Sequence, residues 1–193
     1  MQPIAPLMIE HRLIERMIKI LELELEGWND PDSVDPVFID IAVDFIRTYA
    51  DKTHHGKEED ILFRELKKKE LKDKHRKVME ELIKEHVFGR KTTKELVEAK
   101  ESLQKGDINA FDTIIEKIRA LVSFYPQHID KEDNSFFKEV MQYFNQDELD
   151  MMLEEGRVFD RKMIHRKYNQ VVAQNEKKKD LTTQESSKWI EYM

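Results

Sequence analysis

The stretch "YADKTHHGKEEDILF" (residues 49–63) sets two histidines side by side and, four positions later, two glutamates side by side. Residues four apart lie on one face of a helix, so His54 with Glu58 and His55 with Glu59 form two candidate chelating pairs. These pairs point in different directions. The rest of the chain is needed to decide between them.

The same pattern returns in the second half of the chain. The segment "HIDKEDNSFF" (128–137) matches "HHGKEEDILF" (54–63) in its first His, in Lys at +3, Glu at +4, an acid at +5 and Phe at +9. The segments "LMIEHRLIER" (7–16) and "LIKEHVFGRK" (82–91) share a leading Leu and a Glu-His pair. Metal-ligand residue types recur 74 or 75 positions apart, as His11 and His86, His54 and His128, and Glu58 and Glu132. The two halves are therefore predicted to be two versions of one helical hairpin.

The spacing of apolar residues predicts an all-α protein. Steps of three and four follow one another in four long segments, and the composition has 38% charged residues with only five Gly and five Pro, which favours helices with charged outer faces. Short connections between the segments predict an up-down-up-down four-helix bundle over residues 1–145. Residues 146–180 are predicted to form an additional C-terminal helix, opened by an Asn145 to Glu148 capping pattern and packed on or extending the bundle, with residues 181–193 as a flexible tail.

Composition excludes several kinds of protein. The chain has no cysteine, which rules out disulfides, iron–sulfur clusters and thiolate metal sites. The net charge of −7, without a long basic stripe, argues against nucleic-acid binding. No apolar run reaches the length of a membrane span, and no leader pattern opens the chain, so we expect a cytoplasmic protein that does not contact a membrane.

Four helices converging in a bundle core would bring four imidazoles and two carboxylates together. These candidate metal ligands are His11, His54, Glu58, His86, His128 and Glu132. Buried alone, the carboxylates would each cost several kcal/mol or take up protons, and metal ions remove that cost. Imidazole with carboxylate suits Fe, Mn or Zn. We expect two ions, each with two His, bridged by the two Glu, with coordination positions left for a bridging oxygen and a small exogenous ligand.

The repeat decides between the two pairs of the opening stretch. His54 and Glu58 align with His128 and Glu132, whereas His55 aligns with Ile129. We therefore assign His54 and Glu58 to the metal, and place His55 and Glu59 at the flank, where they support the ligands from outside or face solvent. His55 remains the first candidate for an extra ligand.

Three further positions near the ligands leave alternatives open. Tyr49 and Tyr125 are close to ligands in sequence and either hydrogen-bond a bound oxygen ligand or serve packing. Gly89, one turn after His86, either leaves a channel for a diatomic molecule or is a tolerated glycine.

The order His, His-x-x-x-Glu, His, His-x-x-x-Glu over four helices resembles the hemerythrin-like (HHE cation-binding) family, over about residues 5–144, and "HHGKEEDILF" looks like its second-helix stretch. The resemblance implies a non-haem di-iron centre with an oxo or hydroxo bridge that binds dioxygen or reacts with nitric oxide or peroxide. By matching positions, the six residues above take the ligand role, with Glu58 and Glu132 as bridges.

The sequence departs from the oxygen-carrying members of that family in two ways. Their third helix supplies two histidines four apart, whereas here Leu82 precedes His86 and Arg90 follows it. Their second carboxylate is usually Asp, and here it is Glu132. A missing ligand would leave one more open position on each metal, which favours sensing, scavenging or catalysis over stable reversible oxygen carriage.

The leading hypothesis is a di-iron protein that binds O2 or a related small oxidant (NO, peroxide) as a sensor, store or scavenger. The alternatives are an enzyme with peroxidase or nitric-oxide-reducing activity, and an iron-handling module in which metal occupancy controls the C-terminal helix and an unknown protein partner. The paired Glu-x-x-His motifs of ferritin-like proteins do not occur in the sequence, which disfavours that class.

Overall fold

The structure is a computed structural model, and it describes residues 2–178. The expected tail at 181–193 lies outside this range. The long helices are α1 (Ile4–Gly27), α4 (Asp73–Gln104), α5 (Ala110–Asp130) and α7 (Gln146–Lys178). The shorter α-helical segments are α2 (Pro36–Phe45), α3 (Arg64–Leu66) and α6 (Phe137–Val140). Wide π-helical turns form η2 (Ile46–His55), η3 (Glu58–Phe63) and η4 (Lys131–Phe136), and single 3₁₀ turns form η1 (Pro31–Ser33) and η5 (Met141–Tyr143).

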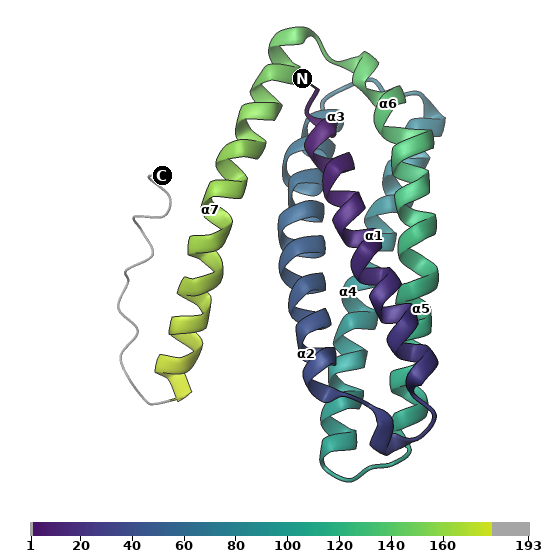
Figure 1. The fold of residues 1–193 in the computed structure, drawn as a ribbon. Helices are drawn as coiled ribbons and strands as arrows, with labels where there is room; N and C mark the ends of the chain where they lie inside the picture. Colours follow the sequence, from purple (N-terminus) through teal and green to yellow (C-terminus); the bar gives the residue numbers. More distant parts are fainter. Residues whose placement is uncertain (1, 179–193) are drawn as a thin grey trace.

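Four of the five long helical rods close into a bundle (Figure 1). The second rod runs without a break from α2 through η2 and η3 to α3, and the fourth runs from α5 through η4 to α6. Around the bundle, α1 packs on α5, α5 on α4, α4 on the second rod, and the second rod on α1. The predicted up-down-up-down bundle with an additional C-terminal helix is confirmed.

The bundle core consists of two apolar clusters with a polar layer between them. One cluster contains Ile14 and Tyr125, and the other contains Leu7 and Phe136. His11 lies between Leu7 and Ile14 on α1, so the change from one apolar cluster to the other falls at this histidine. On each of the other rods, the ligand-type residues likewise separate the residues of one apolar cluster from those of the other. The apolar clusters therefore enclose the polar layer from both ends.

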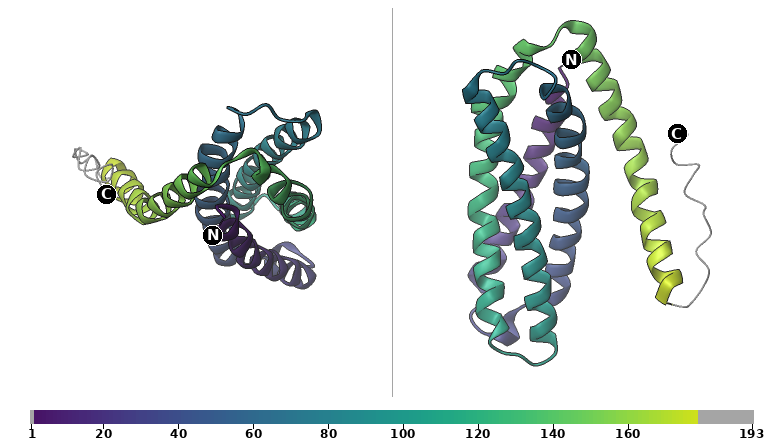
Figure 2. Two further views of the ribbon diagram at one scale, coloured as in Figure 1. Left: turned by 90° about the horizontal axis from the view of Figure 1, so that it is seen from above. Right: turned by 180° about the vertical axis from the view of Figure 1, so that it is seen from behind.

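The additional helix α7 begins at the end of the bundle where α6 finishes and runs back beside it (Figures 1 and 2). Its first turn has the predicted reciprocal cap: the Glu148 amide donates to Asn145 Oδ1 at 3.0 Å, and the Asn145 amide donates to Glu148 Oε2 at 3.0 Å. Its main contacts with the bundle are made to η2 and η3, the π-helical turns of the second rod, and ion pairs join it to Arg64 of α3 and Asp44 of α2. None of the described helices combines the length and apolar composition that a membrane crossing requires.

Candidate metal centre

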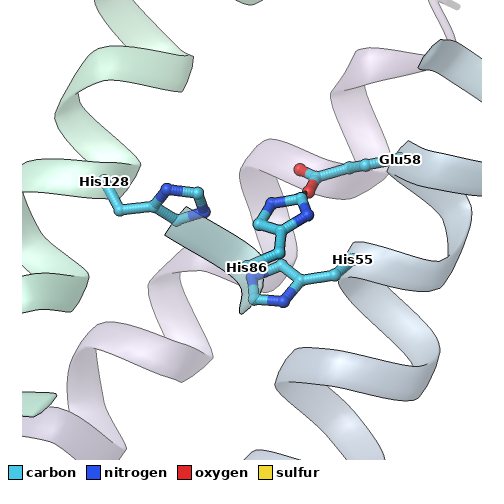
Figure 3. Close-up of side chains that lie close together, drawn as sticks. All are labelled: His55, Glu58, His86 and His128. Atoms are coloured by element: carbon cyan, nitrogen blue, oxygen red, sulfur yellow. Dashed lines mark ion pairs between the residues drawn. The ribbon is translucent and has the colours of Figure 1, made fainter. Parts of the chain in front are cut away.

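The polar layer brings seven side chains that could bind a metal to one place in the core, among them all six predicted ligands. They form two overlapping groups whose donor atoms lie within 4.8 Å of one another in each group. The first group is His55, Glu58, His86 and His128, and the second is His11, His54, Glu58 and Glu132. Figure 3 shows the first group, with side chains from three different rods directed at one another. Glu58 belongs to both groups, as a bridging carboxylate would.

His55 does not lie at the flank, where its sequence position placed it. Its side chain is 3% exposed, and its ring stacks on that of His86 with 3.9 Å between centroids and 11° between planes. The cause is the π-helical turn η2, in which each residue advances through a smaller angle than in an α-helix, so neighbouring residues share a side. His54 and His55 therefore both face the core. Of the two roles that the sequence left open for His55, the position fits the extra ligand.

The carboxylates at the centre have the surroundings of metal-binding groups rather than of ion pairs. Both oxygens of Glu58 and both oxygens of Glu132 are buried and lack a hydrogen-bond partner among the described residues. Imidazole nitrogens are near them, with His54 Nε2 at 3.3 Å and His86 Nε2 at 3.2 Å from Glu58, but they are not aligned for hydrogen bonds. Buried polar atoms are normally satisfied. Apart from His54 Nε2 and His11 Nε2, which lie 2.8 Å apart in hydrogen-bond contact, these donors converge without bonding to each other, which fits metal ions held between them.

Each ligand-type histidine has a carboxylate behind its Nδ1 atom. Four of these pairs are hydrogen-bonded: His11 with Asp133 at 2.8 Å, His54 with Glu10 at 2.9 Å, His86 with Glu59 at 2.7 Å and His128 with Glu85 at 2.7 Å. The fifth, His55 with Asp51, is longer at 3.6 Å. Carboxylates in this position fix the tautomer and orientation of a ligand imidazole and leave Nε2 free for the metal.

Sequence reasoning assigned a supporting position only to Glu59 and missed the other four carboxylates. The signal was in the repeat. The Glu-His pair common to both halves supplies Glu10 and Glu85, and the acid at +5 supplies Glu59 and Asp133. The shared Lys at +3 also has one function in both halves, because Lys57 pairs with Glu10 and Lys131 pairs with Glu85.

Burial and neighbouring charges raise the pKa of two of these histidines and lower the pKa of a third. Burial alone would lower the pKa of His54, but the Glu58 and Glu10 carboxylates outweigh it and raise the pKa to about 10. The pKa of His86 rises to about 11 because the neighbouring Glu132, Glu58 and Glu59 carboxylates outweigh burial. His55 differs, since burial and the charge on His86 hold its pKa well below the usual value. Its imidazole is therefore neutral at pH 7.

The carboxylates at the centre are ionised. Burial and the charge of Glu58 would raise the pKa of Glu132, yet the histidines around it lower the pKa to about 2. The pKa of Glu58 is likewise held well below its usual value, because its interactions with the neighbouring His54 and His86 outweigh burial. Without metal the centre is thus a cluster of imidazolium and carboxylate groups.

A cavity of about 210 Å³ extends from the surface to His55. Gly89 and Tyr125 line it, and Arg47, Lys52 and Arg90 are among its other lining residues. A β-carbon added at Gly89 would lie 3.3 Å from the ring of Phe124, so a side chain there would have little room. Tyr49 does not line this cavity; its ring stacks on Phe45 with 5.1 Å between centroids, which matches a packing role.

His75 is buried away from the centre. Its ring hydrogen-bonds the Tyr143 hydroxyl at 2.7 Å and Glu139 at 2.8 Å, which joins the start of α4 to the turn before α7. It is therefore a structural histidine at a helix end, as its distance from His86 in the sequence indicates.

The fold and this layer of side chains define a class: an antiparallel four-helix bundle whose core can hold metal cations between histidines and carboxylates. Residues 2–140 match the family model described as the hemerythrin HHE cation binding domain. The match covers most of the chain, which therefore belongs to the hemerythrin HHE cation-binding domain family. Comparisons with curated proteins and with solved structures give no match for the chain.

Proposed function

We propose that this protein holds two non-haem iron ions in the polar layer and binds O2 or a related small oxidant, NO or peroxide, as a sensor, store or scavenger. The observation that carries the proposal is the pair of overlapping donor groups that share the buried Glu58. His55, Glu58, His86 and His128 would hold one ion, and His11, His54, Glu58 and Glu132 the other. Manganese and zinc suit the same donors.

The division of the imidazoles supports a centre with one open side. The group with His55 has three imidazoles and the group with His11 has two. Each group has four donor residues, and Glu58 belongs to both. Glu132 Oε1 lies 3.3 Å from His128 Nε2, so if Glu132 were also shared, the first ion would have five donor residues and the second would have four. Iron bound there would supply reversible electron transfer and a free coordination position. The third helix supplies one histidine instead of two, and His55 would take the place of the missing ligand on the ion between His86 and His128. The extra open position is therefore expected only on the other ion, between His11 and His54.

Electrostatics supports cations in this layer. Glu58 and Glu132 are ionised and fully buried, and a carboxylate lies behind each of the five histidines. The four basic side chains that face these carboxylates are Arg12, Lys57, Arg90 and Lys131. With the histidines neutral, as ligands to a metal must be, seven carboxylates against these four basic groups leave an excess of negative charge around a buried site, and divalent or trivalent ions compensate it.

The cavity that ends at His55 is the proposed entry path for the oxidant. Its volume of about 210 Å³ exceeds what a diatomic molecule needs, since one water takes up roughly 30 Å³ of liquid. The excess room favours a second candidate function, an enzyme that reduces peroxide or NO, because turnover requires a substrate to enter and a product to leave. Tyr125 lines this cavity, and its hydroxyl is the proposed hydrogen-bond donor to a molecule held there.

The test uses the full chain loaded with ferrous iron under nitrogen. We expect about two iron ions per chain, and mixing with O2 in a stopped-flow spectrometer should produce a ligand-to-metal charge-transfer band. A stable band that disappears under vacuum supports storage, and rapid irreversible oxidation supports sensing or scavenging. Steady consumption of peroxide or NO in the presence of a reductant would instead support the enzyme. Protein that binds no iron, or one ion at most, would contradict the dinuclear centre.

A further inference from the structure

Lys57 is a buried lysine that connects the metal centre to α7. Its side chain is 5% exposed and pairs with Glu10, the carboxylate behind His54. Its second partner is Asp160 of α7, with 2.8 Å from Nζ to Oδ1. A buried ammonium requires compensation, so its position depends on both carboxylates. Asp160 is thus the outermost member of a chain of contacts that ends on a ligand-type histidine.

The second half of the molecule provides the comparison. Lys131 occupies the repeat position of Lys57 and pairs with Glu85 behind His128, but its other partner is Glu81 at 3.5 Å. Both of these glutamates belong to α4, inside the bundle. Lys131 is also more exposed, at 29%. The two halves therefore share one supporting arrangement, and among the described side chains only the half containing His54 has a member from α7.

A second contact joins α7 to the same turn of helix. Gly56 lies between His55 and Glu58, and a β-carbon added there would lie 2.8 Å from Cζ of Phe159. The Phe159 ring therefore occupies the space that any other residue at position 56 would fill. The repeat has Asp130 at the position of Gly56, and that residue is exposed. The absence of a side chain at Gly56 thus allows α7 to pack directly against the turn that carries the ligand-type residues.

We propose that α7 is a positioning element of the metal centre. Docked through Asp160 and Phe159, it holds Lys57 and Glu10 against His54, so the ion between His11 and His54 is retained only while α7 stays in place. Anything that draws α7 away would release this ion first and leave the ion between His86 and His128 bound. The inference rests on the proposed dinuclear centre and adds to it a means of regulation.

The test compares iron release from the full chain loaded with ferrous iron under nitrogen and mixed with an excess of an iron chelator. Loss of a supporting carboxylate typically weakens metal binding about 10- to 100-fold. Asp160→Asn and Phe159→Ala are each expected to speed release of one of the two ions about tenfold and to leave the other unchanged. The matched control is Glu154→Gln, because Glu154 pairs with Arg157 and Arg161 on α7 itself. Circular dichroism checks that each variant keeps its helix content.

The outcomes separate the two proposals. If both variants released both ions at the wild-type rate, or released both ions faster by the same factor, the role of α7 would be overturned and the dinuclear centre would remain in place. A wild-type protein that holds no pair of ions would overturn the proposed function and the positioning role with it.

Linkage supplies a second measurement, because coupling between two sites is reciprocal. If α7 stabilises the metal, then the metal stabilises docked α7 by the same factor. Amide hydrogens around residues 156–163 are therefore expected to exchange about tenfold more slowly in loaded than in metal-free protein. Equal exchange in the two forms would overturn the coupling. The control amides are those of Asp32 and Ser33 in the 3₁₀ turn η1, which has no buried residue and is far from α7 in sequence.

Discussion

His55 and Ile129 occupy equivalent positions in the two halves, and both are buried. The first is a donor and the second is an aliphatic side chain, so one substitution between the repeats makes the centre unequal. Because His55 stacks on His86 and its pKa is depressed, it offers a neutral ring nitrogen to the group of three imidazoles. The unequal donor groups that support a free coordination position therefore depend on this single residue.

Replacing His55 by the residue found in the repeat tests its role. The variant His55→Ile is expected to lose at least about tenfold in affinity for one of two iron ions, because a ligand is removed while the buried volume is largely kept. Chelator titration followed by metal analysis measures this loss.

The control for this substitution is His75→Ala, which removes a buried histidine with hydrogen bonds to Tyr143 and Glu139. It should lower the melting temperature without changing iron content. Unchanged iron binding in His55→Ile would show that the centre uses only the six residues predicted from the repeat.

At the scale of the helices, the π-helical turns decide which residues enter the core. η2 and η3 lie on the second rod, and η4 lies at the equivalent place on the fourth. Each contains or adjoins a His-x-x-x-Glu motif. A steady spacing of three and four residues predicts an α-helix and gives no sign of a wider turn. This is why the periodicity directed His54 to the core and His55 to the flank, whereas both side chains are buried.

The cap of α7 yields a prediction at the same scale. Asn145→Ala removes the side chain that accepts from the Glu148 amide, and loss of such a cap typically costs about 1 kcal/mol. We expect a lower midpoint in urea unfolding with the slope unchanged, and unchanged iron content because the cap is distant from the centre in sequence. The neighbouring variant Gln146→Ala, whose side chain bonds to Asp150 on the helix surface, serves as control and should change stability by less. Equal effects of the two variants would contradict the role of the cap.

At the scale of the whole molecule, the bundle encloses ionised carboxylates between two apolar clusters. Glu58 and Glu132 have no exposed surface, and their oxygens lack hydrogen bonds within the described chain. Such an arrangement is costly in the metal-free protein. Metal binding to the folded state alone should therefore contribute much of the stability.

Removal of metal is expected to lower the melting temperature. When the free metal concentration is about a thousand times the dissociation constant, binding stabilises the fold by about 4 kcal/mol. For a chain of this length, that corresponds to a rise in melting temperature on the order of 10 °C. Differential scanning calorimetry of the loaded and chelated protein measures the shift, and return of the melting temperature after iron is added back is the control. Identical melting temperatures would indicate that the polar layer is stable without metal.

The pKa values predict that metal binding releases protons. In the metal-free protein His54 and His86 remain protonated at pH 7, because their pKa values are about 10 and 11, and a ligand imidazole must be neutral. Glu132, with a pKa of about 2, has no proton to lose. Raising the pH toward 10 removes the competing protons, so iron affinity should increase with pH.

The proton release can be counted by calorimetry in buffers of different ionisation enthalpy. We expect one proton from each of His54 and His86 per chain at pH 7. A variant at His75, outside the centre, should release the same number. Binding that is independent of pH between 6 and 9 would contradict the assignment.

The sequence by itself determined the helical class, the bundle, the cap of α7 and the six residues repeated between the halves. These features depend on local periodicity and on spacing along the chain, which a sequence displays directly. The repeat also contained Glu10, Glu85 and the paired lysines, but their function could not be read from it. A hydrogen bond between neighbouring helices depends on how each helix is rotated about its axis, and spacing along one helix does not fix that rotation.

The tertiary structure alone decided the position of His55, the carboxylates behind the histidines and the docking of α7. His55 is buried beside His54 in a π-helical turn, where successive residues are separated by a smaller angle. Its repeat counterpart Ile129 is also buried, so alignment with an aliphatic residue did not indicate a position at the flank. The contact of Phe159 with Gly56 joins residues about a hundred positions apart, and neither residue has a local pattern that marks it. Long-range packing, rather than any motif, thus places the fifth helix against the metal centre.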